Sequence, residues 1–107
     1  MNLKFLFLDS TNTSGESQTF YCEEGDTLTL QVQKTSGGAT LNIAVKVKSD
    51  IDGAFQTCGV VDLKDMSTKE AIEAEGMYLV PLSGILQLKV VNSGTAGNCK
   101  VFGVMTA

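Results

Sequence analysis

Short runs in which apolar and polar residues alternate recur along most of this chain. Leu28, Leu30 and Val32 alternate with polar neighbours, and Leu41, Ile43, Val45 and Val47 alternate with polar or small residues. A repeat of two residues is typical of a β-strand with one buried face and one face in water. Turn-forming Gly, Asn, Asp and Ser separate the runs at intervals of about eight to twelve residues, as in sandwiches and barrels. The pattern predicts an all-β protein.

Eight strands are expected from these runs. Their ranges are 3–8, 18–22, 27–34, 39–49, 55–63, 77–82, 86–92 and 98–105. The turn Ser36-Gly37-Gly38 is expected to join the strands at 27–34 and 39–49 as a hairpin.

One segment departs from the alternation and predicts a short helix near residues 68–75. Ser67 and Glu70 have the spacing of a capping box, in which each side chain satisfies a free backbone donor of the first helical turn. Ala71, Ile72 and Ala74 are compatible with two helical turns, and Gly76 is a natural stop. The expected fold is therefore an antiparallel β-sandwich, jelly-roll or immunoglobulin-like, of about eight strands and one short helix. Residues 1–107 are expected to form this single domain.

The first predicted strand is apolar on both faces. Phe5 and Phe7 are expected on one face, and Leu6 and Leu8 on the other. Such a strand is either buried on both sides or packs against a neighbouring chain. Leu6 and Leu8 are therefore candidate interface residues, and the alternative is an ordinary central strand.

Charge and hydropathy narrow the choice of partners. The chain carries a formal net charge of −4, and its eight basic residues are single, scattered lysines without any arginine. A nucleic-acid partner is not expected, because such proteins use a basic stripe to displace counterions. No apolar run reaches the roughly 18 residues that cross a bilayer, so no membrane partner is expected either. Residues 1–8 are too short for a signal peptide, and synthesis in the cytoplasm without export is expected.

The sequence contains few residues that could support catalysis or bind a metal or cofactor. The absence of His excludes Ser–His and Cys–His dyads, and no glycine-rich phosphate loop is present. Cys22, Cys58 and Cys99 lack the spacing of a metal pair; they are expected to be buried thiols, the alternative being a bridge between two of them. No catalytic residue, cofactor or metal is expected, and the protein is predicted not to be an enzyme.

Two acidic segments are better explained as turns than as sites. Asp50-x-Asp52-Gly53 resembles the start of a calcium loop, but no further carboxylate follows at the required offsets. Glu23, Glu24 and Asp26 form the densest acidic group, and they are expected to lie on a solvated turn.

Seven aromatic residues and no Trp leave little material for a sugar-binding platform. Tyr21 is the ring expected to be exposed, and it is added to the candidate interface residues. Most of the other rings are expected in the core.

Three stretches of this sequence resemble small β-sandwich proteins of tailed-phage virions. They are residues 49–55 (SDIDGAF), 76–84 (GMYLVPLSG), and 86–90 (LQLKV) leading into 100–104 (KVFGV). The resemblance covers roughly residues 26–104, and the helix-like insert at 67–76 departs from it.

The resemblance implies a non-enzymatic structural protein, most simply one that decorates a phage capsid. The implied partners are the major capsid protein or other virion subunits, the implied assembly is a homo-oligomer, and the implied location is the virion. The alternative is a carbohydrate- or receptor-binding module of a fibre or tail, with a groove lined by Tyr21, Asn12 and Asn98.

Overall fold

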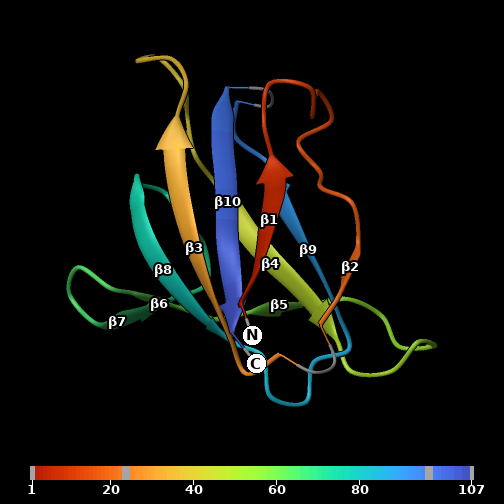
Figure 1. The fold of residues 1–107 in the computed structure, drawn as a ribbon. Helices are drawn as coiled ribbons and strands as arrows, with labels where there is room; N and C mark the ends of the chain where they lie inside the picture. The colour runs from red at the N-terminus through yellow and green to blue at the C-terminus, as the bar shows by residue number, and fades with distance from the viewer. Residues whose placement is uncertain (1, 23–24, 96–97, 107) are drawn as a thin grey trace.

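The protein consists of two antiparallel β-sheets packed face to face (Figure 1). The structure, a computed structural model, describes residues 2–22, 25–95 and 98–106, in which there are ten strands and no helix. The six-stranded sheet contains, in spatial order, β1 (Asn2–Leu8), β10 (Cys99–Thr106), β3 (Thr27–Lys34), β8 (Gly76–Pro81), β6 (Val60–Asp62) and β7 (Ser67–Lys69). The four-stranded sheet contains β2 (Phe20–Tyr21), β9 (Gln87–Asn92), β4 (Ile43–Lys48) and β5 (Gln56–Cys58). The predicted all-β antiparallel sandwich is confirmed, with ten strands in place of about eight.

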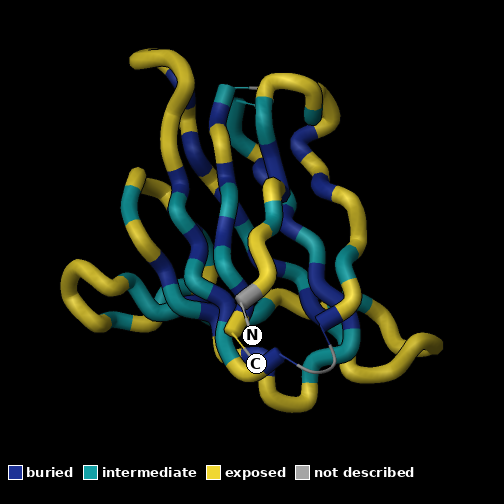
Figure 2. Tube along the Cα trace, in the orientation of Figure 1, coloured by how far each residue is buried: buried dark blue, intermediate teal, exposed yellow. Residues whose placement is uncertain are grey.

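The core lies between the two sheets and follows from the alternation in the sequence. On β3, Leu28, Leu30 and Val32 are buried, and the intervening residues face outward. Ile43 and Val45 of β4 supply apolar side chains from the opposite sheet. Each side chain of this size contributes about 1.5–3 kcal/mol when it leaves water. Exposed positions are concentrated in the connecting loops (Figure 2).

Three phenylalanines close one side of the sandwich, where β1 of one sheet lies near β2 of the other. The ring centroids of Phe5 and Phe20 are 5.2 Å apart, and those of Phe7 and Phe20 are 5.0 Å apart, both in edge-to-face geometry. Phe5 and Phe7 stack at 5.6 Å. Edge-to-face and offset packing are the preferred arrangements of aromatic pairs, so this cluster ties the two edges together.

The predicted hairpin between residues 27–34 and 39–49 is wrong. β3 belongs to the six-stranded sheet, whereas β4 pairs with β9 and β5 in the other sheet. The chain crosses between the sheets through residues 35–42, where Ala39 and Leu41 are buried. A hairpin would put the apolar faces of β3 and β4 side by side, whereas the crossing places them opposite each other and covers both.

The single strand predicted at 55–63 is divided between the two sheets. β5 pairs with β4, and β6 pairs with β8 and β7. Gly59 lies at the change of sheet, where an added Cβ would lie 3.2 Å from the Thr68 methyl group. This division and the strand β7 raise the strand count.

The helix predicted near 68–75 is not formed. Ser67 begins strand β7, and its hydroxyl donates a 2.6 Å hydrogen bond to the Asp65 carboxylate instead of capping a helix. Ile72 is fully buried and exchanges two backbone hydrogen bonds with Ile43, at 2.9 and 2.7 Å. A two-turn helix is marginal by itself. Burial of the one large apolar side chain of this segment, paired in an extended conformation with Ile43, is the more favourable arrangement.

Candidate interaction surface

β1 is an edge strand, and a β-bulge divides it into two parts. Residues 2–6 pair in regular register with residues 106–102 of β10, and the register then shifts between Leu6 and Leu8. Leu6 is 50% exposed, whereas Phe7 and Leu8 are 3% and 1% exposed. The prediction that Leu8 shares an outer face with Leu6 is therefore wrong, because the bulge turns two successive residues inward. Leu8 is a core residue and is withdrawn from the candidate interface.

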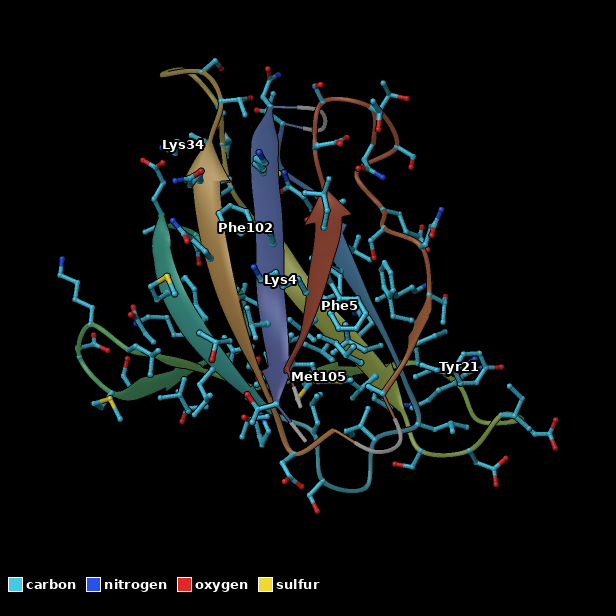
Figure 3. All side chains as sticks on the ribbon, in the orientation of Figure 1. Lys4, Phe5, Tyr21, Lys34, Phe102 and Met105 are labelled. Carbon is cyan, nitrogen blue, oxygen red and sulfur yellow. The ribbon has the colours of Figure 1, made fainter. Side chains whose placement is uncertain are left out.

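The outer face of β1 continues across β10 as a mixed apolar and basic surface. Leu6 lies opposite Phe102, and Lys4 lies opposite Val104, so these four side chains share the outer face of the sheet. Together with Lys100, they line a shallow hollow on this face. Figure 3 shows Lys4 and Phe102 on the near side of the two strands. We call Lys4, Leu6, Lys100, Phe102 and Val104 the outer patch.

Phe102 was expected in the core with most other rings, and the sequence reading missed it as a surface residue. In the structure, buried Val101, Gly103 and Met105 alternate with half-buried Phe102 and Val104, but apart from Gly103 these residues are all apolar, so the sequence does not mark which face is outward. Gly103 has no space for a side chain, since an added Cβ would lie 2.7 Å from the Thr29 carbonyl oxygen. Because Gly103 has no apolar side chain, the inward face of β10 is also harder to recognise from the sequence.

The two lysines of the outer patch form no ion pair among the described residues, although Lys100 lies close enough to Asp9 for its charge to help lower the Asp9 pKa. Among the described residues, the ion pairs join Lys69 to Asp62 and Asp65, and Lys89 to Glu16. The Lys100 ammonium lies 5.7 Å from the centroid of the Phe102 ring, within the range of a cation–π contact. The outer patch is thus a local positive region on a chain of net charge −4.

A groove lies beside the C-terminal end of β1, between this strand and the segment that leads into β2. Leu6, Phe7 and Phe20 contribute its apolar part, and Asp9, Thr11, Asn12 and Gln18 contribute its polar part.

Short hydrogen bonds hold the polar wall of this groove. The Asp9 carboxylate accepts bonds from the Thr11 hydroxyl and backbone N–H, at 2.6 and 2.8 Å, and these bonds lower the Asp9 pKa. The Asn12 side-chain oxygen accepts from the Asp9 backbone N–H at 2.9 Å. The wall is therefore anionic and locally ordered.

Tyr21 is 62% exposed, which confirms that this ring faces solvent. It lies on β2, at the edge of the other sheet and away from the outer patch (Figure 3).

The groove expected from Tyr21, Asn12 and Asn98 is not formed. Tyr21 pairs with Gln87 at the start of β9, whereas Glu16, next to the Asn12 turn, pairs with Val91 near its end. Four residues of strand span about 13–14 Å, so the ring and the turn lie at opposite ends of β9. Asn98 precedes β10, and its carbonyl accepts a bond from Thr35, which begins the crossing between the sheets.

The remaining candidate groups have structural explanations. The Asp50 carboxylate accepts a 2.9 Å bond from the Asp52 backbone N–H, as expected for a plain turn. Cys22, Cys58 and Cys99 are free thiols, and burial raises the pKa of each. In the described part of the chain, no three His, Cys, Asp or Glu side chains gather closely enough to hold a metal ion. The acidic turn residues Glu23 and Glu24 lie outside the described residues.

No helix in the described ranges is long and apolar enough to cross a membrane.

Comparison with known proteins gives matches to solved structures. No protein-family model matches the sequence, and no curated protein matches it. The SPBc2 prophage-derived protein YomS is similar in structure, with a TM-score of 0.86 and 15% sequence identity over 100% of this chain and 94% of that one. The PBSX exported protein XepA is also similar, with a TM-score of 0.82 and 16% identity. That match covers 98% of this chain and 37% of XepA, so the chain spans about a third of that protein. The resemblance to small β-sandwich proteins of phages is confirmed at the level of the fold: the chain has a fold that is found in prophage-derived proteins.

Proposed function

We propose that this protein is a non-enzymatic structural component of a phage particle, most specifically a subunit that decorates the capsid. The observation that carries the proposal is the fold, which matches a prophage-derived protein over the whole chain. The outer patch supports it, because an exposed apolar group flanked by lysines is typical of a surface that a partner covers. The proposed partner is the major capsid protein, and the proposed location is the virion.

A decoration protein needs only modest contacts at each position. The outer patch is small compared with the roughly 800 Å² that each partner buries in a standard stable interface. Closed symmetry repeats one contact at many equivalent sites, so a small contact can still stabilise a shell. We propose that Leu6 and Phe102 form the apolar centre of this contact, and that Lys4 and Lys100 form its basic rim.

Add-back to particles that lack the protein tests this proposal. The purified chain is mixed with such particles, and bound protein is measured after sedimentation. Wild type is expected to co-sediment saturably, and Leu6→Asp is expected to lose binding while its circular dichroism spectrum is unchanged. Thr57→Asp is the matched control, because Thr57 is exposed on β5 of the other sheet. Equal binding by Leu6→Asp and wild type would contradict the proposed contact.

The role of Tyr21 as an interface residue and the formation of a homo-oligomer stay predictions within this proposal. Tyr21 lies on the edge of the other sheet, so Tyr21→Ala in the same assay measures whether a second surface takes part. Sedimentation equilibrium of the free chain measures whether it forms the predicted homo-oligomer.

A further inference from the structure

β1 has an open edge, and it is the long edge strand of this sandwich. The other three edge strands, β7, β5 and β2, have three, three and two residues, whereas β1 has seven. In the described residues, the backbone of β1 makes no hydrogen bond other than those of its ladder with β10. Alternate N–H and C=O groups of an antiparallel strand point to each side, so about half of those on β1 face away from β10 without a protein partner.

An edge of this kind is a binding site for another strand. Natural proteins shorten, charge or cover their exposed edges, because an open edge pairs with other chains. β1 carries two such devices, the charge of Lys4 and the bulge after Leu6, but residues 2–6 stay in regular register and no other strand covers their outward edge. The groove described above lies at the C-terminal end of the same edge, where Leu6, Phe7 and Phe20 form its apolar part and can receive inward-facing side chains of an added strand.

We infer that the free edge of β1 binds an extended segment of a partner protein as an additional antiparallel strand of the six-stranded sheet. This inference rests on the proposed function, because we take the segment to belong to another virion protein. It adds the kind of segment that β1 recognises. Every strand pair of the structure is antiparallel, and the added strand continues that order. Main-chain hydrogen bonds supply affinity in this mode, and alternate side chains supply specificity.

The residues on β1 define the sequence of that segment. On the outer face, an apolar residue would lie opposite Leu6, and an acidic residue would lie opposite Lys4, whose ammonium group has no carboxylate partner among the described residues. Inward-facing residues would be apolar, because they meet Phe7 and Phe20. The partner segment therefore has apolar residues on its inward face. On its outward face it has one apolar and one acidic residue, two positions apart.

Lys4 makes a second copy of this chain a poorer occupant than such a segment. A symmetric β1–β1 pair centred on residue 4 would place the two Lys4 side chains opposite each other, and like charges at that position are destabilising. A pair centred on Phe5 avoids this clash but sets each Lys4 against Leu6, so neither ammonium group gains a carboxylate. Charge complementarity therefore favours an acidic partner strand over self-pairing.

Binding of a synthetic strand tests the inference directly. The probe is a blocked seven-residue peptide, TVLVEVT, whose leucine and glutamate lie opposite Leu6 and Lys4 in the antiparallel register. Fluorescence anisotropy measures affinity for the full chain, and amide hydrogen exchange reports which backbone groups become protected. Saturable binding with new protection on β1 is the expected result.

Two complementary N-methylated peptides show whether the backbone edge is the site. Alternate amides of an added strand face β1, so methylation of one alternate set is expected to weaken binding by at least about tenfold. Methylation of the other set is expected to leave binding unchanged. Equal binding of both methylated peptides, or no saturable binding of the unmodified peptide, would overturn the inference.

A charge exchange tests the assigned partner of Lys4. Lys4→Glu is expected to reverse the preference between TVLVEVT and its lysine analogue TVLVKVT, by a few-fold each way as for an exposed ion pair. A concentration-dependent dimer of the free chain with protected β1 amides would overturn the choice of a heterologous strand. Absence of the protein from particles would contradict the proposed function and leave peptide binding unaffected, so the two failures are distinguishable.

Discussion

Leu6 and Leu8 lie two residues apart on β1, yet Leu6 is 50% exposed and Leu8 is 1% exposed. In a regular strand, residues two apart share a face, so the bulge between them separates their roles. Leu8→Ala is expected to lower the free energy of unfolding by about 2–5 kcal/mol, because it leaves a cavity in the core. Leu6→Ala is expected to change it by less than about 0.5 kcal/mol. Urea denaturation of both variants measures the difference, and equal losses would mean that β1 is a regular strand.

Gly94 is required by a close approach of two loops. A Cβ built on Gly94 would lie 2.1 Å from the Thr40 carbonyl oxygen, which accepts a 2.8 Å bond from the Thr95 backbone N–H. Gly94→Ala is expected to cost at least about 1–3 kcal/mol, because backbone has to move. Gly38→Ala is the matched control, since nothing lies within 4 Å of its added Cβ. Thermal unfolding measures both, and an unchanged midpoint for Gly94→Ala would contradict the loop contact.

Tyr78 links stability to alkaline pH. Its hydroxyl donates a 2.8 Å bond to the Ala74 carbonyl, and burial, followed by the nearby Asp62 and Asp65 carboxylates, raises the Tyr78 pKa above 10. The neutral phenol is favoured in the folded state, so its contribution is complete below pH 10 and is lost as the pH rises through the folded pKa.

Tyr78→Phe is expected to reduce this alkaline loss and to lower stability near pH 7 by about 1 kcal/mol, through loss of the hydrogen bond. The buried thiols titrate in the same direction and are common to both proteins, so the difference between the two pH profiles isolates Tyr78. Parallel profiles above pH 10 would contradict the assignment.

Thiol reactivity tests the cysteine assignment. Burial raises the Cys22 pKa to about 11, so at pH 8 roughly one molecule in a thousand carries the reactive thiolate at this site. In native protein, half-buried Cys58 is expected to be alkylated before buried Cys22 and Cys99. All three are expected to react after unfolding without reductant. A mass spectrum with two unreactive cysteines would instead show a disulfide.

The strands could be predicted from the sequence wherever one face is buried and the other is wet. β3, β8, β9 and β10 lie close to their predicted ranges because alternation reports burial directly. Alternation does not report which sheet a strand joins, and for this reason the crossing through residues 35–42 was read as a hairpin. The same limit applies at Gly59, where continuous strand character hides a change of sheet.

The outer patch was only partly predictable. The surface position of Leu6 was predicted from the apolar residues on both faces of the first strand. The same prediction for Leu8 was wrong, because a bulge depends on the partner strand and leaves no mark in the sequence of β1. Phe102 was missed because an aromatic residue within an apolar run is usually buried. The helix was predicted from local capping residues, and the long-range pairing of Ile72 with Ile43 overrode that local preference.

The central claim is that this chain is a structural part of a phage particle. Quantitative mass spectrometry of phage particles purified from the source of this sequence tests this claim most directly, through the copy number of the chain relative to the major capsid protein. A ratio of order one is predicted for a capsid decoration subunit. A few to tens of copies would keep the structural role and contradict the decoration role. Absence from the particles would contradict the account.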